Sequence, residues 1–162
     1  MDEPTGTLID NWADTRAAWR ELVSGAQSTL TICEVDLTAL TPDAPAMHQT
    51  LRQALPRLRR DGLRILLLDA AHLIAHLPRT RALLNDYAHI ASVRIAAQRD
   101  ASAMARAVLI ADDRHILTRP QHDRPRSMLN LNTPLNCRLN GAQLETIWDA
   151  AANANIGTVL GL

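Results

Sequence analysis

Acidic side chains gather at the ends of predicted strands, and they are the first candidates for chemistry in this sequence. The residues at three such ends are Glu34 with Asp36, Asp69 with His72, and Asp112 with Asp113. Carboxylates that meet at strand ends can bind a cation or act as general acid and base. Aspartate is also a common turn residue, so a purely structural role stays open for each of them.

His72 and His76 have the spacing that places two imidazoles on one face of a helix, as in zinc sites. No glutamate follows the first histidine, no third ligand is identifiable, and Pro78 limits any helix here. We therefore expect no metal and no cofactor.

A basic cluster surrounds the end of a predicted helix. It consists of Arg57, Arg59, Arg60 and Arg64. Arginines near a helix C-terminus interact favourably with its dipole, and an anion-binding role is the alternative.

Nucleophilic sites are not evident. There is no Gly-x-Ser-x-Gly turn and no glycine-rich phosphate loop. Cys33 lies within a predicted strand and Cys137 on the apolar stripe of a predicted helix, so both thiols should be buried rather than reactive. All 17 basic residues are arginine, which excludes any mechanism that requires a lysine.

Composition limits the classes of function. The 162 residues are 47% hydrophobic and carry 17 basic against 17 acidic side chains, so the formal net charge is zero. That balance argues against a protein that holds nucleic acid or an anionic membrane by bulk charge. No apolar run is long enough to cross a bilayer and no signal peptide is recognisable, so we expect a cytoplasmic protein without membrane partners.

The hydrophobic pattern alternates between helix and strand periods, which gives the elements that must position these residues. Helices are predicted over 9–23, from 41 to an end at Asp61-Gly62 with a kink or an irregular last turn at Pro56, over 79–91, and from Thr133-Pro134 to about 151. Strands are predicted over 29–36, 63–68, 93–98, 105–111, 114–118 and 128–131, with a tight turn at Asp112-Asp113.

This order of elements predicts one α/β domain spanning residues 1–162, with residues 1–8 flexible. Helices between the early strands imply parallel crossovers, and the hairpin adds an antiparallel part. The sheet is therefore mixed and partly parallel, with helices on both of its faces, and residues 105–111 form a central strand.

The strand from Ala105 and the turn that follows it resemble the phospholipase D superfamily, where a strand carries His-x-Lys-x-x-x-x-Asp before a turn and a return strand. Asp112 matches the aspartate of that motif, whereas Ala105 and Ala107 stand at the histidine and lysine positions. Asp36-Leu37, the Asp112-Asp113-Arg114 turn and the late Trp148 look similar to a degenerate, uncharacterised bacterial family with this fold.

The resemblance implies a phospholipase D-like domain without phosphodiesterase activity. In the active superfamily the histidine takes up the phosphoryl group and the lysine holds its oxygens, and alanine does neither. We therefore expect a non-catalytic binding or regulatory domain with no catalytic residues. The alternatives are a homodimeric protein-interaction domain, or a hydrolase with changed chemistry that uses Asp36, Asp112 and His115.

A cleft at the strand ends would hold the ligand. Its candidate residues are Glu34, Asp36, Asp69, His72, Asp112, Arg114, His115 and Arg119. The partners compatible with this hypothesis are a small anion, a second copy or another protein, and nucleic acid is not expected. Without the motif's cations, a buried Asp112 should pair with Arg114 or Arg119, or accept backbone amides of the hairpin.

Overall fold

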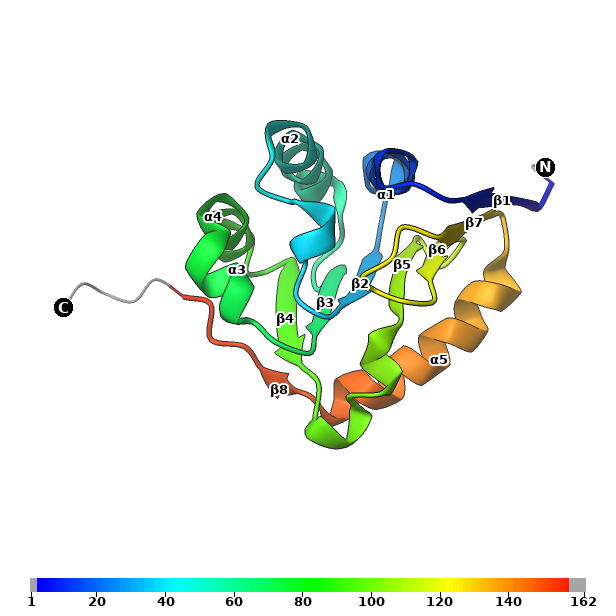
Figure 1. Ribbon diagram of the computed structural model, residues 1–162. Helices are drawn as coiled ribbons and strands as arrows, with labels where there is room; N and C mark the ends of the chain where they lie inside the picture. The colour runs from blue at the N-terminus through cyan, green and yellow to red at the C-terminus, as the bar shows by residue number, and fades with distance from the viewer. Residues whose placement is uncertain (1–2, 158–162) are drawn as a thin grey trace.

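The computed structural model describes residues 3–157, which form a mixed sheet with helices on both faces (Figure 1). The strands are β1 (Thr5–Ile9), β2 (Leu30–Glu34), β3 (Leu63–Leu67), β4 (Ala91–Ile95), β5 (Ala107–Ala111), β6 (His115–Arg119), β7 (Ser127–Leu131) and β8 (Ala152–Asn153). Their spatial order is β1-β7-β6-β5-β2-β3-β4-β8. The strands β2, β3 and β4 run parallel, and every other pairing is antiparallel. The predicted mixed, partly parallel sheet is confirmed.

The helices divide unequally between the two faces. One face is covered by α1 (Trp12–Gly25), α2 (Pro45–Ala54), α3 (Ala71–His76) and α4 (Pro78–Asp86), and the other by α5 (Pro134–Ala150) (Figure 1). We call these the four-helix face and the α5 face. Predicted helices on both faces are therefore confirmed.

Capping residues set several helix ends. The Asn11 side chain accepts a hydrogen bond from the backbone N–H of Asp14 at 2.8 Å and so begins α1. Pro56 turns the end of α2 into a 3₁₀ turn over Leu55–Arg57, so the helix ends before the predicted stop at Asp61-Gly62. The Arg57 guanidinium that follows donates to the carbonyl of Ser24 at 2.6 Å, at the end of α1. Arg57 therefore ties the ends of α1 and α2 together.

The N-terminal segment corrects one prediction. Residues 5–8, expected to be flexible, belong to β1, which pairs with β7 along its whole length. Its uncharged Thr-Gly-Thr-Leu-Ile sequence, partly β-branched, suits an edge strand. Residues 1–2 lie outside the described part of the chain.

The region after β3 corrects a second prediction. In place of a loop and one helix over 79–91, the chain forms α3, a break at Leu77, and α4, which ends at Asp86. Pro78 begins a helix here because proline is well accommodated in a first helical turn.

The central strand β5 is buried on both sides, which explains its unbroken apolar sequence. Leu109 and Ala111 pack in the core under the four-helix face, while Val108 and Ile110 pack with residues of α5. The predicted central strand is confirmed from residue 107, and Ala103–Ala105 form a 3₁₀ turn before it.

The α5 face carries polar residues on the parallel strands, because a single helix cannot cover the whole sheet. Thr31, Arg64 and Ser92 are register partners across β2, β3 and β4, and Thr31 and Arg64 alternate with buried residues in their strands. The four-helix face of the same strands is apolar. A polar floor is thus left beside α5.

Gly62, just before β3, has no room for a side chain. A Cβ at this position would lie 2.6 Å from the carbonyl oxygen of Ser28 and 2.7 Å from that of Arg59. We therefore predict that Gly62→Ala lowers the free energy of unfolding by about 1–3 kcal/mol, measured by urea denaturation. The matched control is Gly141→Ala in α5, where a Cβ meets nothing within 4 Å and a gain of roughly 0.5–1 kcal/mol is expected. Equal effects of the two substitutions would contradict this interpretation.

Candidate functional site

The residues predicted to share one cleft lie at two opposite ends of the sheet. Glu34 and Asp36 are at the carboxyl end of β2, and Asp69 and His72 follow the parallel β3 at the same end. Asp112, Arg114 and His115 lie at the other end, because β5 runs antiparallel to β2 with Leu30 opposite Ala111 and Cys33 opposite Val108. The expectation of a single cleft is therefore wrong.

Asp36 and Asp69 make local turns. An Oδ1 atom of Asp36 accepts the N–H of Thr38 at 3.0 Å, and that of Asp69 accepts the N–H of Ala71 at 2.8 Å. Both carboxylates thus have the structural role that sequence analysis kept as an alternative. His72 and His76 lie on α3 with ring centroids 5.3 Å apart. Within residues 3–157, no group of three metal-ligating side chains comes together.

The residues of the hydrolase hypothesis do not converge. Asp36 and Asp112 are separated by the length of β2, roughly 17 Å for five residues. His115 lies near Asp112, but its Nδ1 accepts the backbone N–H of Asn132 at 3.0 Å. No arrangement of these three groups can act on one substrate atom.

Asp112 joins the turn after β5 to the segment before β2. Its carboxylate accepts the backbone N–H groups of Gln27, Ser28 and Thr29 at 3.0, 2.8 and 3.0 Å. Its own N–H donates to the carbonyl of Thr29 at 2.9 Å, and its φ is 56°. The carboxylate does accept backbone amides, but they belong to residues 27–29, so the predicted contact with amides of the hairpin is wrong.

Neither predicted arginine pairs with Asp112. Arg114 donates through Nε to the side chain of Asn132 at 2.9 Å, and Arg119 lies at the opposite end of β6. Three amide donors satisfy the carboxylate without a cation.

We predict that Asp112→Ala lowers the free energy of unfolding by about 1–3 kcal/mol, since it leaves amides of residues 27–29 without an acceptor. The control is the adjacent Asp113→Ala, which has a similar φ of 52° and an exposed side chain. Thermal unfolding of both variants measures the difference. An Asp112→Ala variant as stable as Asp113→Ala would refute a structural role.

A buried ion pair lies beside Ala107, at the start of β5. Ala107 pairs with Arg119 in the β5–β6 ladder. The Nη2 atom of Arg119 donates to Oε2 of Glu34 at 2.8 Å, and the two side chains are 3% and 6% exposed. Arg119 also donates to the carbonyl of His122 at 2.9 and 3.0 Å and lies 5.3 Å from the ring centre of Trp12.

Burial dominates the electrostatics of this pair. Loss of hydration raises the pKa of Glu34 to about 7, while the charge and hydrogen bond of Arg119 oppose the rise and the Asp36 charge adds to it. Burial also raises the pKa of Cys33 to about 12 and that of Cys137 to about 11. The thiols are therefore not nucleophiles at neutral pH.

Stability should depend on pH through Glu34. Its folded pKa lies above the unfolded value of 4.5, so the folded state holds a proton that the unfolded state releases between pH 4.5 and about 7. The contribution of this group to stability is complete below pH 4.5 and is lost as the pH rises through 7. Arg119→Met removes the attraction that lowers the pKa of Glu34. The pKa of Glu34 therefore rises further in this variant, and the stability that Glu34 contributes is lost at a higher pH.

We predict that Arg119→Met lowers the free energy of unfolding by about 3–5 kcal/mol at pH 8, since it leaves a buried carboxylate without its cation. Urea unfolding at pH 5 and pH 8 should show a smaller loss at pH 5. The control is the double variant Glu34→Gln/Arg119→Met, which has no titrating group at this pair and should lose the part of the pH dependence that Glu34 contributes. An equal loss for Arg119→Met at both pH values would contradict this account.

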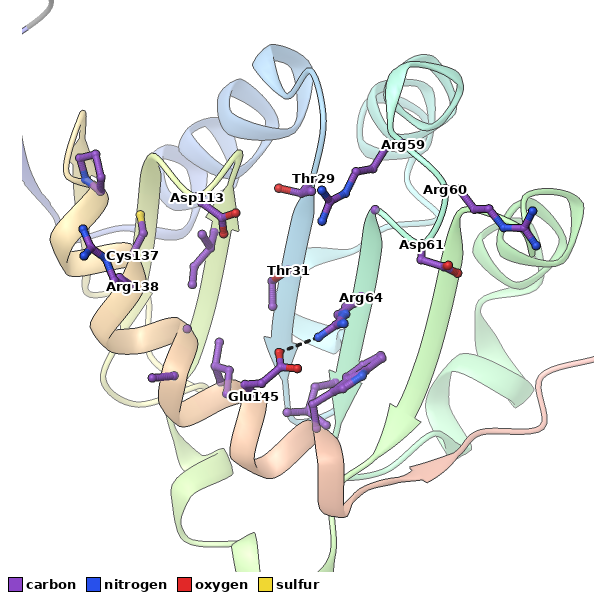
Figure 2. A pocket seen from close by; sticks show the side chains of 18 residues that line it. Thr29, Thr31, Arg59, Arg60, Asp61, Arg64, Asp113, Cys137, Arg138 and Glu145 are labelled. Atoms are coloured by element: carbon purple, nitrogen blue, oxygen red, sulfur yellow. Dashed lines mark hydrogen bonds and ion pairs between the residues drawn. The ribbon is translucent and has the colours of Figure 1, made fainter.

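A groove of about 770 Å³ opens between α5 and the sheet, on the opposite face from the ion pair (Figure 2). Its floor includes Thr29, Thr31 and Arg64, near the start of β2 and β3, and its outer wall is α5. None of the eight predicted cleft residues lines it. The predicted basic cluster supplies Arg59, Arg60 and Arg64 to this groove. The alternation of Thr29 and Thr31 with apolar residues predicts the strand but does not by itself show that these hydroxyls line a groove.

Backbone hydrogen bonds fix the turn that presents Arg59 and Arg60. The N–H of Arg59 donates to Ser28 at 3.0 Å, and the N–H of Gly62 donates to Arg59 at 2.9 Å. Figure 2 shows the Arg59 side chain extending toward Thr29, at the end of the groove. The turn is therefore a rigid support for flexible side chains.

Arg64 lies in the middle of the groove. Its Nη1 is 2.7 Å from Oε2 of Glu145 on α5, and its guanidinium carbon is 5.1 Å from the ring centre of Trp148. Arg94 also approaches that ring, at 4.5 Å, and donates to the Trp148 carbonyl at 2.9 Å. The Arg64 and Glu145 side chains are 39% and 55% exposed, so water weakens their attraction.

Comparisons with known proteins identify a matching family model and solved structures of similar fold. A family model described as Domain of unknown function (DUF7931) matches residues 11–155. No curated protein matches the sequence. Among solved structures, the phospholipase D family member Nuc from Salmonella typhimurium is similar with a TM-score of 0.68 at 12% identity, over 94% of this chain and 99% of that one.

Two further structures share the fold. NucT from Helicobacter pylori is similar with a TM-score of 0.66 at 13% identity, over 94% of this chain and all of that one. TrmBL2, an archaeal chromatin protein described as having a novel mode of DNA binding, is similar with a TM-score of 0.66 at 12% identity. That match covers 92% of this chain, which spans 54% of TrmBL2. The predicted phospholipase D-like fold is confirmed by these neighbours.

Proposed function

The chain belongs to the family described as Domain of unknown function (DUF7931), and we propose that it is a non-catalytic phospholipase D-like domain with a binding or regulatory role. The observation that carries this proposal is the buried pair of Glu34 and Arg119 beside Ala107. It stands where the superfamily motif would place its lysine.

The chemistry of the superfamily needs a nucleophile and a cation that this site lacks. Ala105 and Ala107 supply neither, and the absence of lysine from the whole chain means that a second copy cannot complete the site. Arg119 does supply a charge here, but Glu34 and the carbonyl of His122 already bind it. A phosphodiester would have to break these contacts before it met the guanidinium.

None of the helices within residues 3–157 has the length and apolar character of a membrane span. One structural neighbour, TrmBL2, is described as an archaeal chromatin protein with a novel mode of DNA binding. The same scaffold in a chromatin protein supports a role in binding.

We predict no turnover above buffer on a chromogenic phosphodiester, a phospholipid or DNA, because no nucleophile stands at residue 105. Activity that survives repurification and disappears in Asp112→Asn, but not in Asp113→Asn, would overturn the proposal. Circular dichroism of both variants checks that they are folded.

A further inference from the structure

We propose that the groove between α5 and the sheet binds a small phosphate monoester, with Arg59 and Arg64 as the principal contacts. This inference rests on the proposed binding role and assigns it to the face of the sheet opposite the ion pair. Its position is independent of the superfamily motif, since none of the motif positions lines the groove.

The groove collects guanidinium groups from three separate segments. Arg59 and Arg60 come from the turn before β3, Arg64 from β3, and Arg138 from α5. In the described part of the chain, the side chains of Arg59, Arg60 and Arg138 take part in no ion pair or hydrogen bond. Figure 2 shows Arg60 and Arg138 on opposite sides of the groove, which leaves Arg59 beside Thr29 and Arg64 in the middle of the groove as the guanidinium groups on which the proposal rests. Arginine forks of this kind bind phosphate oxygens in pairs.

An incoming anion can replace Glu145 as the partner of Arg64. Its carboxylate occupies Arg64 from α5, but both side chains are partly exposed, so the pair is weak. A phosphate with two negative charges competes well with one carboxylate for that guanidinium. Figure 2 shows Glu145 reaching across the groove to Arg64, and an incoming anion would take its place.

The threonine hydroxyls on the floor and the volume of the groove indicate the chemical class of the group that is esterified to the phosphate. The side-chain hydroxyls of Thr29 and Thr31 line the floor and have no hydrogen-bond partner among residues 3–157. At about 770 Å³ the groove is far larger than a phosphate ion and falls within the range of small-molecule sites. A polyhydroxylated body, such as a phosphorylated sugar, fits both features.

Two acidic residues that line the groove disfavour a polyanion as its ligand. Asp61 and Asp113 also line the groove, and the chain as a whole carries no net positive charge. A nucleic acid would meet these carboxylates along its backbone, whereas one phosphate needs only a local contact. The observations therefore favour a small ligand.

The test is isothermal titration of the full chain with ribose 5-phosphate at low ionic strength. We expect saturable binding, with ribose binding undetectably and inorganic phosphate binding more weakly. Ribose 5-carboxylate analogues that bind as tightly as ribose 5-phosphate would overturn the assignment to phosphate. A single-stranded oligonucleotide that binds more tightly would overturn the assignment to a small ligand.

Substitutions locate the site. Arg59→Gln and Arg64→Gln should each weaken binding about tenfold, which is the usual cost of one charge-assisted hydrogen bond. Glu145→Gln should strengthen it, because the competing carboxylate is gone while the shape is retained. The control is Arg99→Gln, an exposed arginine outside the groove, which should bind like the parent.

Binding that is unchanged in both Arg59→Gln and Arg64→Gln would refute the groove as the site, and so would the absence of binding in the parent and in Glu145→Gln. The Arg59 side chain is exposed and forms no hydrogen bond or ion pair within residues 3–157, so its variant keeps the test valid if Arg64→Gln fails to fold. The phosphodiesterase assay is separate, since a failed titration leaves the non-catalytic proposal intact and turnover would refute that proposal alone.

Discussion

The antiparallel placement of β5 between β2 and β6 decides which polar groups of this domain meet. It sends the end of β5 to the start of β2, where Asp112 binds the amides of residues 27–29. It also brings the start of β5, and with it the partner strand's Arg119, to the end of β2, where Glu34 lies. Each pairing depends on this one reversal of direction.

The ion pair is a costly feature for a strand end that the resemblance would make catalytic. Two charges that are almost fully buried lose most of their hydration, and only a good partner and further acceptors offset that loss. Arg119 has the carbonyl of His122 as a further acceptor and Trp12 as an aromatic neighbour. The ion pair therefore lies buried under the four-helix face with each charge satisfied by protein groups.

Local patterns predicted most of the elements, because alternating or continuous apolar residues report burial directly. The apolar β5 and the disturbance at Pro56 belong to this class. The direction of a strand cannot be read from local patterns, since it is set by pairing with residues far away in the sequence. The prediction of a single cleft was wrong because β5 runs antiparallel to β2. The six-residue α3 is too short for a periodicity to stand out. The groove could not be foreseen because it depends on how much of the sheet α5 leaves uncovered.

The strand β2 contributes to both the buried ion pair and the groove, on opposite faces of the sheet. Glu34 points toward the four-helix face and Thr31 toward α5. The two regions share no side chain, and the sheet separates them. Substitutions in one should therefore add to those in the other without coupling. Such independence lets selection alter the specificity of the groove while the ion pair keeps maintaining the folded state, so relatives with this fold can diverge in ligand without a matching change in stability.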